Sequence, residues 1–272
     1  MVEKAQEGAP LKFDAGEHIL HHIGDSQVLD LQPFGEIHLP TLRLGPLVLP
    51  ITRHVVMMWA ACAVIALIVW LANRKRSMVP HGIRNLMEAM VVFVRDDLAR
   101  ENIPHHADRF VPYLLSTFTF VLVCNLLGLL PYGATPTGNI GVTAGLAGVA
   151  FLMIQGAGIR EHGLVGHFKN LVPHGIPLAL VPIMVLVEFI GMFTKPFALC
   201  VRLFANMTGG HVVITSLIGL VFILRRAWVG AVLSVPFSLF IDGIEILVAF
   251  LQAYIFTMLT ALFIGMSAHP QH

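Results

Sequence analysis

Three charged side chains interrupt a long apolar run in the C-terminal half of this sequence. Between Leu178 and Leu224 the only residues with a formal charge are Glu188, Lys195 and Arg202. A guanidinium stays protonated at any accessible pH, and placing it at the centre of a membrane helix costs between ~2.5 and ~17 kcal/mol. Because arginine does not release its proton, Arg202 is suited to act as a fixed charge that attracts a passing carboxylate or blocks a passing cation.

The charged residues of this run share one side of a helix. Glu188, Lys195 and Arg202 are seven residues apart, so at ~100° per residue they drift only ~40° in total and form a polar stripe. Asn206 follows one turn after Arg202 and extends the stripe, whereas His211 lies on about the opposite face of an unbroken helix. Lys195 has two interpretations, a snorkelling side chain or a residue that lines a polar channel.

A second apolar segment nearer the C-terminus carries Asp242, Glu245 and Gln252. If the two segments form an antiparallel hairpin, folded at the basic pair between them, residues whose numbers add to about 455 lie level with each other. This arithmetic places His211 beside Glu245 and Arg202 beside Gln252, and Asp242, one turn before Glu245, is expected to line the same path. A histidine close to a carboxylate forms a coupled pair that titrates near neutrality. The pair is therefore either a proton relay or a hydrogen-bonded structural pair.

An unusually apolar chain positions these residues. Hydrophobic residues make up 56% of the 272 residues, charged residues make up 12%, and the mean hydropathy is +0.79. This composition is typical of a polytopic membrane protein. The net charge of +1 and the lack of a basic run with interleaved aromatic residues argue against nucleic-acid binding. We therefore predict an all-α membrane fold with about five spanning helices.

The apolar segments divide the chain into a polar tail, residues 1–50, and a membrane domain, residues 51–272. Residues 55–72 carry no charge and are followed by a basic cluster at 74–76, which predicts a first span that ends on the cytoplasmic side. The N-terminus is then outside and the C-terminus cytoplasmic, and residues 160–174 form a polar inner loop. The other predicted elements are an amphipathic interfacial helix at 80–103, spans at 110–131 and 139–159, and a hairpin of 176–224 and 229–268.

The hairpin arm that contains Arg202 is too long to stand upright in a bilayer. As one helix, the 47 residues of the apolar run would be ~70 Å long, against a hydrocarbon core of ~30 Å. The arm must tilt steeply or break, and the sites where a break is expected are Pro182, Pro196 and the Gly209-Gly210 pair.

Histidines are frequent in the polar tail. They are His18, His21, His22 and His38. Because His21 and His22 are adjacent rather than at metal-ligand spacing, a solvated or partner-bound tail is favoured over a metal site.

Two stretches of the C-terminal half carry a family resemblance. They are residues 195–211, KPFALCVRLFANMTGGH, and residues 245–256, EILVAFLQAYIF. Both strongly resemble subunit a of the rotary F-type ATP synthases. The resemblance extends back through residues 125–131, NLLGLLP, and Glu188, and covers most of the chain from Val55 onward.

The resemblance implies roles for the polar residues. Arg202 would be the essential arginine that faces the rotating ring of c subunits, with two offset aqueous half-channels meeting the ring on either side of it. His211 and Glu245 would be the proton-relay pair of the outer half-channel. The implied polar linings are Asn206 and Gln252 near the arginine and Glu188 in the inner half-channel.

The resemblance also implies partners and a location. The partners are the c-subunit ring, the peripheral-stalk b subunits, other ATP synthase subunits and the lipid bilayer, and the location is a bacterial inner membrane. An autonomous ion transporter or channel with an intramembrane Arg-Glu-His relay is the main alternative. An intramembrane enzyme that uses His211 and Glu245 is disfavoured, because the sequence has no metal-ligand spacing or nucleophile motif. We therefore expect a non-catalytic subunit without a metal or cofactor.

Overall fold

The computed structural model describes residues 28–30, 36–39, 41–44, 47–74, 81–130, 135–169, 180–223 and 227–268. Within this part of the chain, five helices are long and apolar enough to cross a membrane. The candidate spans are Arg53–Arg74, Val111–Gly128, Ile140–His167, Val181–Leu217 and Pro236–Ala268. The prediction of an all-α polytopic membrane protein with about five spanning helices is confirmed.

Two short hairpins precede the first helix. β1 (Val28–Asp30) pairs antiparallel with β2 (Glu36–His38), and β3 (Thr41–Leu44) pairs antiparallel with β4 (Leu47–Pro50). The sequence predicts only a polar tail here, because runs of three or four residues are too short for a reliable strand pattern. Of the tail histidines, His38 lies in β2, whereas His18, His21 and His22 lie outside the described residues.

The predicted interfacial helix consists of two consecutive elements. After the first span, α2 (Arg53–Arg74), come α3 (Ile83–Val92) and the π-helix η1 (Phe93–Arg100). Asp96 binds the guanidinium of Arg95 at 2.8 Å and that of Arg100 at 2.9 Å. The hydrogen bond from Arg95 and its positive charge hold the pKa of the Asp96 carboxyl below its ordinary value. The opposite face of η1 is apolar and buried, so the segment is amphipathic as predicted.

The third of the five candidate spans extends beyond its predicted end. The short helix η2 (Ala107–Arg109) leads into α4 (Val111–Gly128), and η3 (Pro136–Gly138) leads into α5 (Ile140–Lys169). Because α5 continues to Lys169, the prediction of a loop from residue 160 is wrong for this stretch. Gly163 has φ of 70° and kinks the helix, and glycine reaches this φ without a Cβ penalty. The polar residues after Arg160 therefore continue the helix around a corner.

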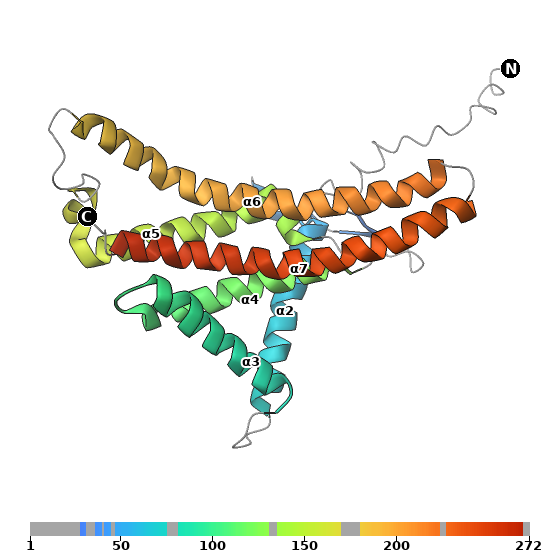
Figure 1. Cartoon of the computed structure of the whole chain (residues 1–272), viewed down its shortest axis with the longest axis horizontal. Helices are drawn as coiled ribbons and strands as arrows, with labels where there is room; N and C mark the ends of the chain where they lie inside the picture. The colour runs from blue at the N-terminus through green and yellow to red at the C-terminus, as the bar shows by residue number, and fades with distance from the viewer. Residues whose placement is uncertain are drawn as a thin grey trace.

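The last two helices form the predicted hairpin. α6 (Val181–Ile223) and α7 (Ala227–Ala268) run side by side along the molecule, and α2 stands steeply across them (Figure 1). α6 contains Pro196 and remains one helix, so the structure shows a bowed helix rather than a break. A helix of 43 residues is ~65 Å long and must lie obliquely to cross a ~30 Å hydrocarbon core.

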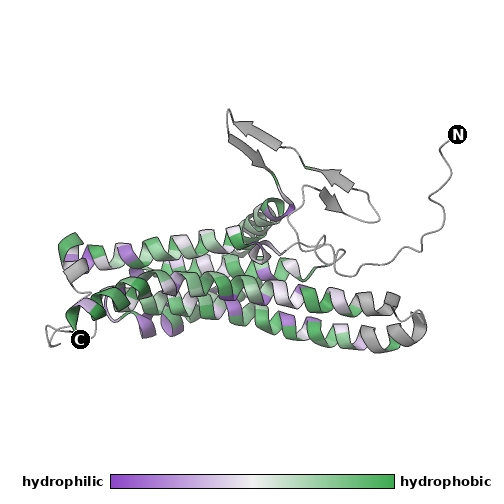
Figure 2. Cartoon of the chain, turned by 90° about the horizontal axis from the view of Figure 1, so that it is seen from above, coloured by the Kyte–Doolittle hydropathy of each residue, from purple (hydrophilic) through white to green (hydrophobic). Residues whose placement is uncertain are grey.

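The buried core lies where α7 packs against α4, α5 and η1. The buried positions of α7 include small residues, Ala249, Ala253 and Ala261, which are 0% exposed. Small residues on one face let neighbouring helices approach closely. Figure 2 shows that most residues of the helices are apolar, and many large apolar side chains are exposed, as expected for a protein that faces lipid.

Candidate functional site

Two contacts between α6 and α7 fix the register of the hairpin. A Cβ added at Gly210 would overlap the carboxylate of Glu245, so this side chain lies directly against the backbone of α6. Farther along, Nζ of Lys195 lies 5.4 Å from the centroid of the Phe263 ring. The residue numbers of these two pairs add to 455 and 458, in agreement with the predicted value of about 455.

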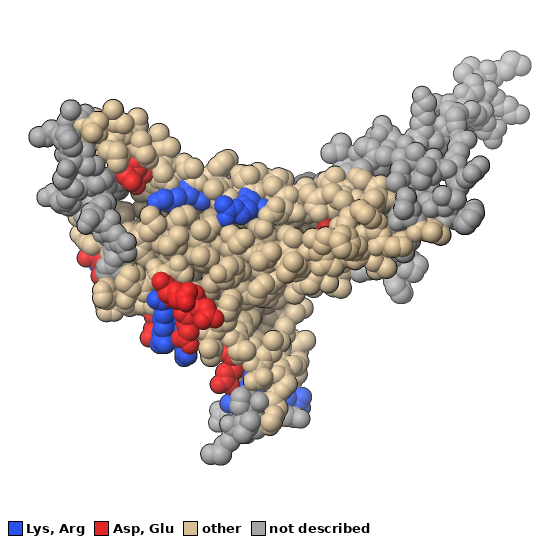
Figure 3. Space-filling view, viewed as in Figure 1, with Lys and Arg blue, Asp and Glu red and all other residues tan. Residues whose placement is uncertain are grey.

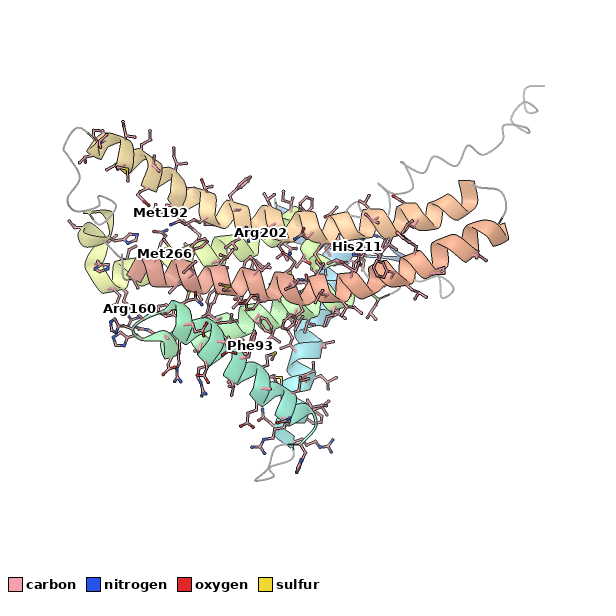
Figure 4. The ribbon with its side chains drawn as sticks, in the orientation of Figure 1. Phe93, Arg160, Met192, Arg202, His211 and Met266 are labelled. Carbon is pink, nitrogen blue, oxygen red and sulfur yellow. The ribbon has the colours of Figure 1, made fainter. Side chains whose placement is uncertain are left out.

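His211 follows Gly210 on α6 and is therefore near the level of Glu245. Its ring nitrogen Nε2 forms a hydrogen bond with Oγ1 of Thr135, which lies at the start of the turn between α4 and α5. Figure 4 shows His211 and Arg202 in the stretch of α6 that runs beside α7. His211 is half-buried, so part of it is accessible while Thr135 holds its Nε2 atom.

Glu245 is half-buried on α7. Its Oε1 atom is buried and forms no hydrogen bond with any residue that the structure describes. A buried polar atom without a partner costs ~1–3 kcal/mol, so a purely structural role gives no reason to keep it. Asp242, one turn earlier, is exposed. The two carboxyl groups thus lead from the surface of α7 toward the level of His211.

Arg202 is exposed on α6, although it lies in a candidate span. Its guanidinium forms no ion pair or hydrogen bond with another residue in the described part of the chain. Gln252 is on α7 and is only 6% exposed. Among the described residues, Arg202 and Gln252 form no direct hydrogen bond with each other.

The polar stripe of α6 lies partly on the surface. Glu188 and Asn206 are exposed like Arg202, whereas Lys195 is half-buried and its ammonium lies over Phe263. A cation over an aromatic face gains ~0.5–2 kcal/mol, so Lys195 is held between the two helices. Figure 3 shows basic and acidic groups in a row along α6, apart from the charged cluster at η1 below the hairpin. The stripe offers fixed charges to a neighbouring molecule.

Hydrogen bonds of partly or fully buried polar side chains join the residues at η3 to the helices α4, α6 and α7. Asn125 on α4 donates from Nδ2 to the carbonyl of Ala249 on α7 at 3.2 Å, and Thr137 donates to Oδ1 of Asn125 at 2.7 Å. Thr208 on α6 donates to the carbonyl of Gly138 at 3.4 Å. The sequence patterns single out Asn125 only as part of a family motif and miss the threonines. Their signal is weak, since a Thr-Pro-Thr turn between two spans is also common in ordinary loops.

Comparisons with known proteins identify the family of this chain. The sequence profile of the ATP synthase A chain matches residues 55–265. The chain belongs to the ATP synthase A chain family. It is 53% identical to ATP synthase subunit a of Chloroherpeton thalassium over 97% of this chain and 79% of that protein. It is 46% identical to ATP synthase subunit a of Anaeromyxobacter sp. over 94% of this chain and 72% of that protein.

The part matched by the ATP synthase A chain profile includes all elements of the site. Residues 55–265 run from α2 to near the end of α7, so the hairpin and the turn at η3 lie inside it, and the four strands precede it. With its five apolar helices, this member of the family is a membrane protein.

Proposed function

We propose that this chain is the proton-conducting stator subunit of an F-type ATP synthase. It forms two offset aqueous half-channels against the c ring and couples proton flow to rotation without being catalytic itself. Its partners are the c-subunit ring and the peripheral-stalk b subunits. It lies in a bacterial inner membrane with its N-terminus outside and its C-terminus cytoplasmic. Membership of the ATP synthase A chain family supports this role.

The main support for the proposal is Arg202, whose guanidinium is exposed and has no partner in the described part of the chain. A permanent cation in a membrane span is stable only beside an anion or water, and no residue in the described part of the chain pairs with it. A carboxylate on a neighbouring ring at ~4 Å and an effective dielectric constant of ~20 attracts it by ~4 kcal/mol before desolvation. Arg202 thus holds the ring carboxylate in its charged form.

The outer half-channel uses the groups that lie level with Gly210. A proton that enters from outside passes Asp242 and exchanges between Glu245 and His211 before it reaches the ring. The buried Oε1 of Glu245, which has no hydrogen-bond partner among the described residues, supports this role, since an oxygen without a structural bond can accept a proton. Each proton that crosses the membrane down the potential releases ~2.3 kcal/mol of free energy per 100 mV.

The inner half-channel lies on the other side of Arg202. Glu188 is exposed 14 residues earlier on α6, ~21 Å along the helix, and receives the proton released by the ring. Asn206 and Gln252 line the region near the arginine. Because the guanidinium repels a proton that moves directly from one path to the other, each proton must travel with the ring.

Arg202→Ala in the assembled enzyme tests this function. We expect ATP-driven proton pumping to be abolished while the complex stays intact, as checked by co-purification of this chain with the c ring. Arg100→Ala is the matched control, because Arg100 belongs to the exposed ion cluster at η1 and should leave pumping unchanged. Normal pumping by Arg202→Ala would refute the proposal. Sustained proton flux through the purified chain alone in liposomes would instead favour an autonomous channel.

A further inference from the structure

The turn between α4 and α5 places a buried hydroxyl beside His211. Thr135 is only 4% exposed, and its Oγ1 is bonded to Nε2 of the imidazole. The turn reaches this position because α4 has a glycine opposite it. A Cβ at Gly128 would overlap the Thr135 side chain, so this glycine provides the space that the threonine occupies.

A hydroxyl can keep its hydrogen bond to an imidazole nitrogen while that nitrogen gains or loses a proton. It accepts a hydrogen bond from a protonated ring nitrogen and donates one to an unprotonated ring nitrogen. We propose that Thr135 is a positioning residue of the proton relay: its hydroxyl holds Nε2 of His211 whether or not that nitrogen is protonated, and so fixes the orientation of the imidazole beside Glu245. This inference rests on the proposed function of His211.

The turn itself is anchored to the second helix of the relay. Thr137, two residues after Thr135, donates to Asn125, and Asn125 donates to the carbonyl of Ala249. Ala249 is one helical turn after Glu245 on α7. Thr137 and Asn125 are both 0% exposed, and buried networks of this kind stay ordered because breaking one bond leaves a partner unsatisfied. The hydrogen bonds of Thr135 and Thr137, together with the backbone between these two residues, thus connect the imidazole of His211 to α7, the helix of Glu245.

The first test compares Thr135→Val with Thr135→Ser in the assembled synthase. Valine has the shape of threonine without the hydroxyl, and serine keeps the hydroxyl. We expect Thr135→Val to lower ATP-driven proton pumping per assembled complex on the order of 10-fold, within the contribution of a positioned proton-transfer group. Thr135→Ser should stay within about twofold of the wild type. Thr260→Val is the control. Thr260 is also buried, and among the described residues its hydroxyl donates only to the Phe256 carbonyl of its own helix.

A double variant separates positioning from a general effect on the fold. If Thr135 acts through His211, Thr135→Val combined with His211→Gln should pump no more slowly than His211→Gln alone. If valine at position 135 prevents assembly, Thr135→Ala provides the same comparison. Equal loss in the valine and serine variants, or wild-type pumping in Thr135→Val, would overturn the positioning role. Wild-type pumping in His211→Gln would instead overturn the relay of the proposed function.

Discussion

Glu245 of α7 packs its carboxylate directly against the backbone of Gly210 of α6, the residue before His211. Only a residue without a side chain leaves room for this approach. The contact sets the depth of the carboxyl group relative to the imidazole through backbone geometry. The level of the proposed relay therefore depends on a glycine.

Gly210→Ala should uncouple proton transport with little loss of stability. Its new Cβ overlaps the end of the Glu245 side chain, which can rotate away, so the helices need not separate. A displacement of ~1 Å at a reacting group lowers the rate by up to ~100-fold, and we expect a loss of at least ~10-fold in ATP-driven proton pumping.

Gly209→Ala is the matched control for this change. A Cβ at Gly209 meets nothing within 4 Å, and alanine is favoured over glycine in a helix by ~1 kcal/mol. Pumping by Gly209→Ala should equal that of the wild type, and its thermal stability should be the same or higher. Equal pumping by the two alanine variants would contradict the importance of the contact.

Cysteines at positions 211 and 245 should form a disulfide in a chain whose Cys62, Cys124 and Cys200 have been replaced. A disulfide requires Cα atoms within ~7 Å, and the register of the hairpin brings these positions to the same level. The readout is the mobility of the oxidised chain after cleavage between the helices. A pair at positions 215 and 241, which shares the same register, is the positive control.

A pair at positions 211 and 251 is the negative control for the crosslink. Position 251 is six residues beyond position 245, ~9 Å along α7, so it lies outside the reach of a disulfide. Ready crosslinking of 215 with 241 without crosslinking of 211 with 245 would contradict the predicted pairing.

The hairpin was predictable because its polar residues are rare. Glu188 and Arg202 on one helix and Glu245 on the next stand out among nearly uncharged residues and so identify the polar face of each helix. The position of the turn between the helices then predicts which residues of the two arms lie at the same depth. The direction of the side chains was not predictable in the same way. Arg202 is exposed and Gln252 is buried, and the burial of Gln252 depends on how α7 packs against α4 and α5.

The features that the sequence did not predict depend on backbone conformation and on distant contacts. α5 continues past Arg160 because Gly163 takes a positive φ at the kink, whereas a polar stretch after a span normally indicates a loop. The bond between Thr135 and His211 joins residues 76 positions apart. A threonine next to a proline in a short connection has no periodicity, so nothing in the pattern predicts its partner.

Asn125→Leu should destabilise the assembled chain. The leucine removes the bond to the Ala249 carbonyl and leaves the buried hydroxyl of Thr137 without its acceptor, at a cost of ~1–3 kcal/mol. We expect the purified complex to release this chain at a lower temperature. Asn73→Leu is the control, since Asn73 is exposed and donates only to the Val69 carbonyl of its own helix. Equal release temperatures for the two variants would argue against the network.

Gly265→Ala should show the opposite behaviour to Gly210→Ala. Its Cβ would meet the backbone carbonyl of Asn102, at the end of the η1 segment, and a backbone group cannot rotate away as a carboxylate can. The contact between α7 and η1 must loosen, and overpacking of this kind costs ~1–3 kcal/mol. At ~2–4 °C per kcal/mol, the release temperature of the chain should fall by several degrees. Gly145→Ala, where a Cβ meets nothing within 4 Å, is the control.

Proton pumping distinguishes Gly210 from Gly265, the two glycines of the hairpin discussed above. Gly265 is 20 residues beyond Glu245 on α7, ~30 Å along the helix, so the complexes that remain assembled in Gly265→Ala should pump at the wild-type rate. Gly210→Ala should instead assemble normally and pump slowly, because its added atom displaces the proposed proton carrier Glu245 and not a helix. Each variant is therefore described by two measurements, the rate of proton pumping per assembled complex and the temperature at which the complex releases this chain. If both variants lost stability and pumping in the same proportion, the contact at Gly210 would be ordinary helix packing, without a separate effect on the position of the Glu245 carboxylate.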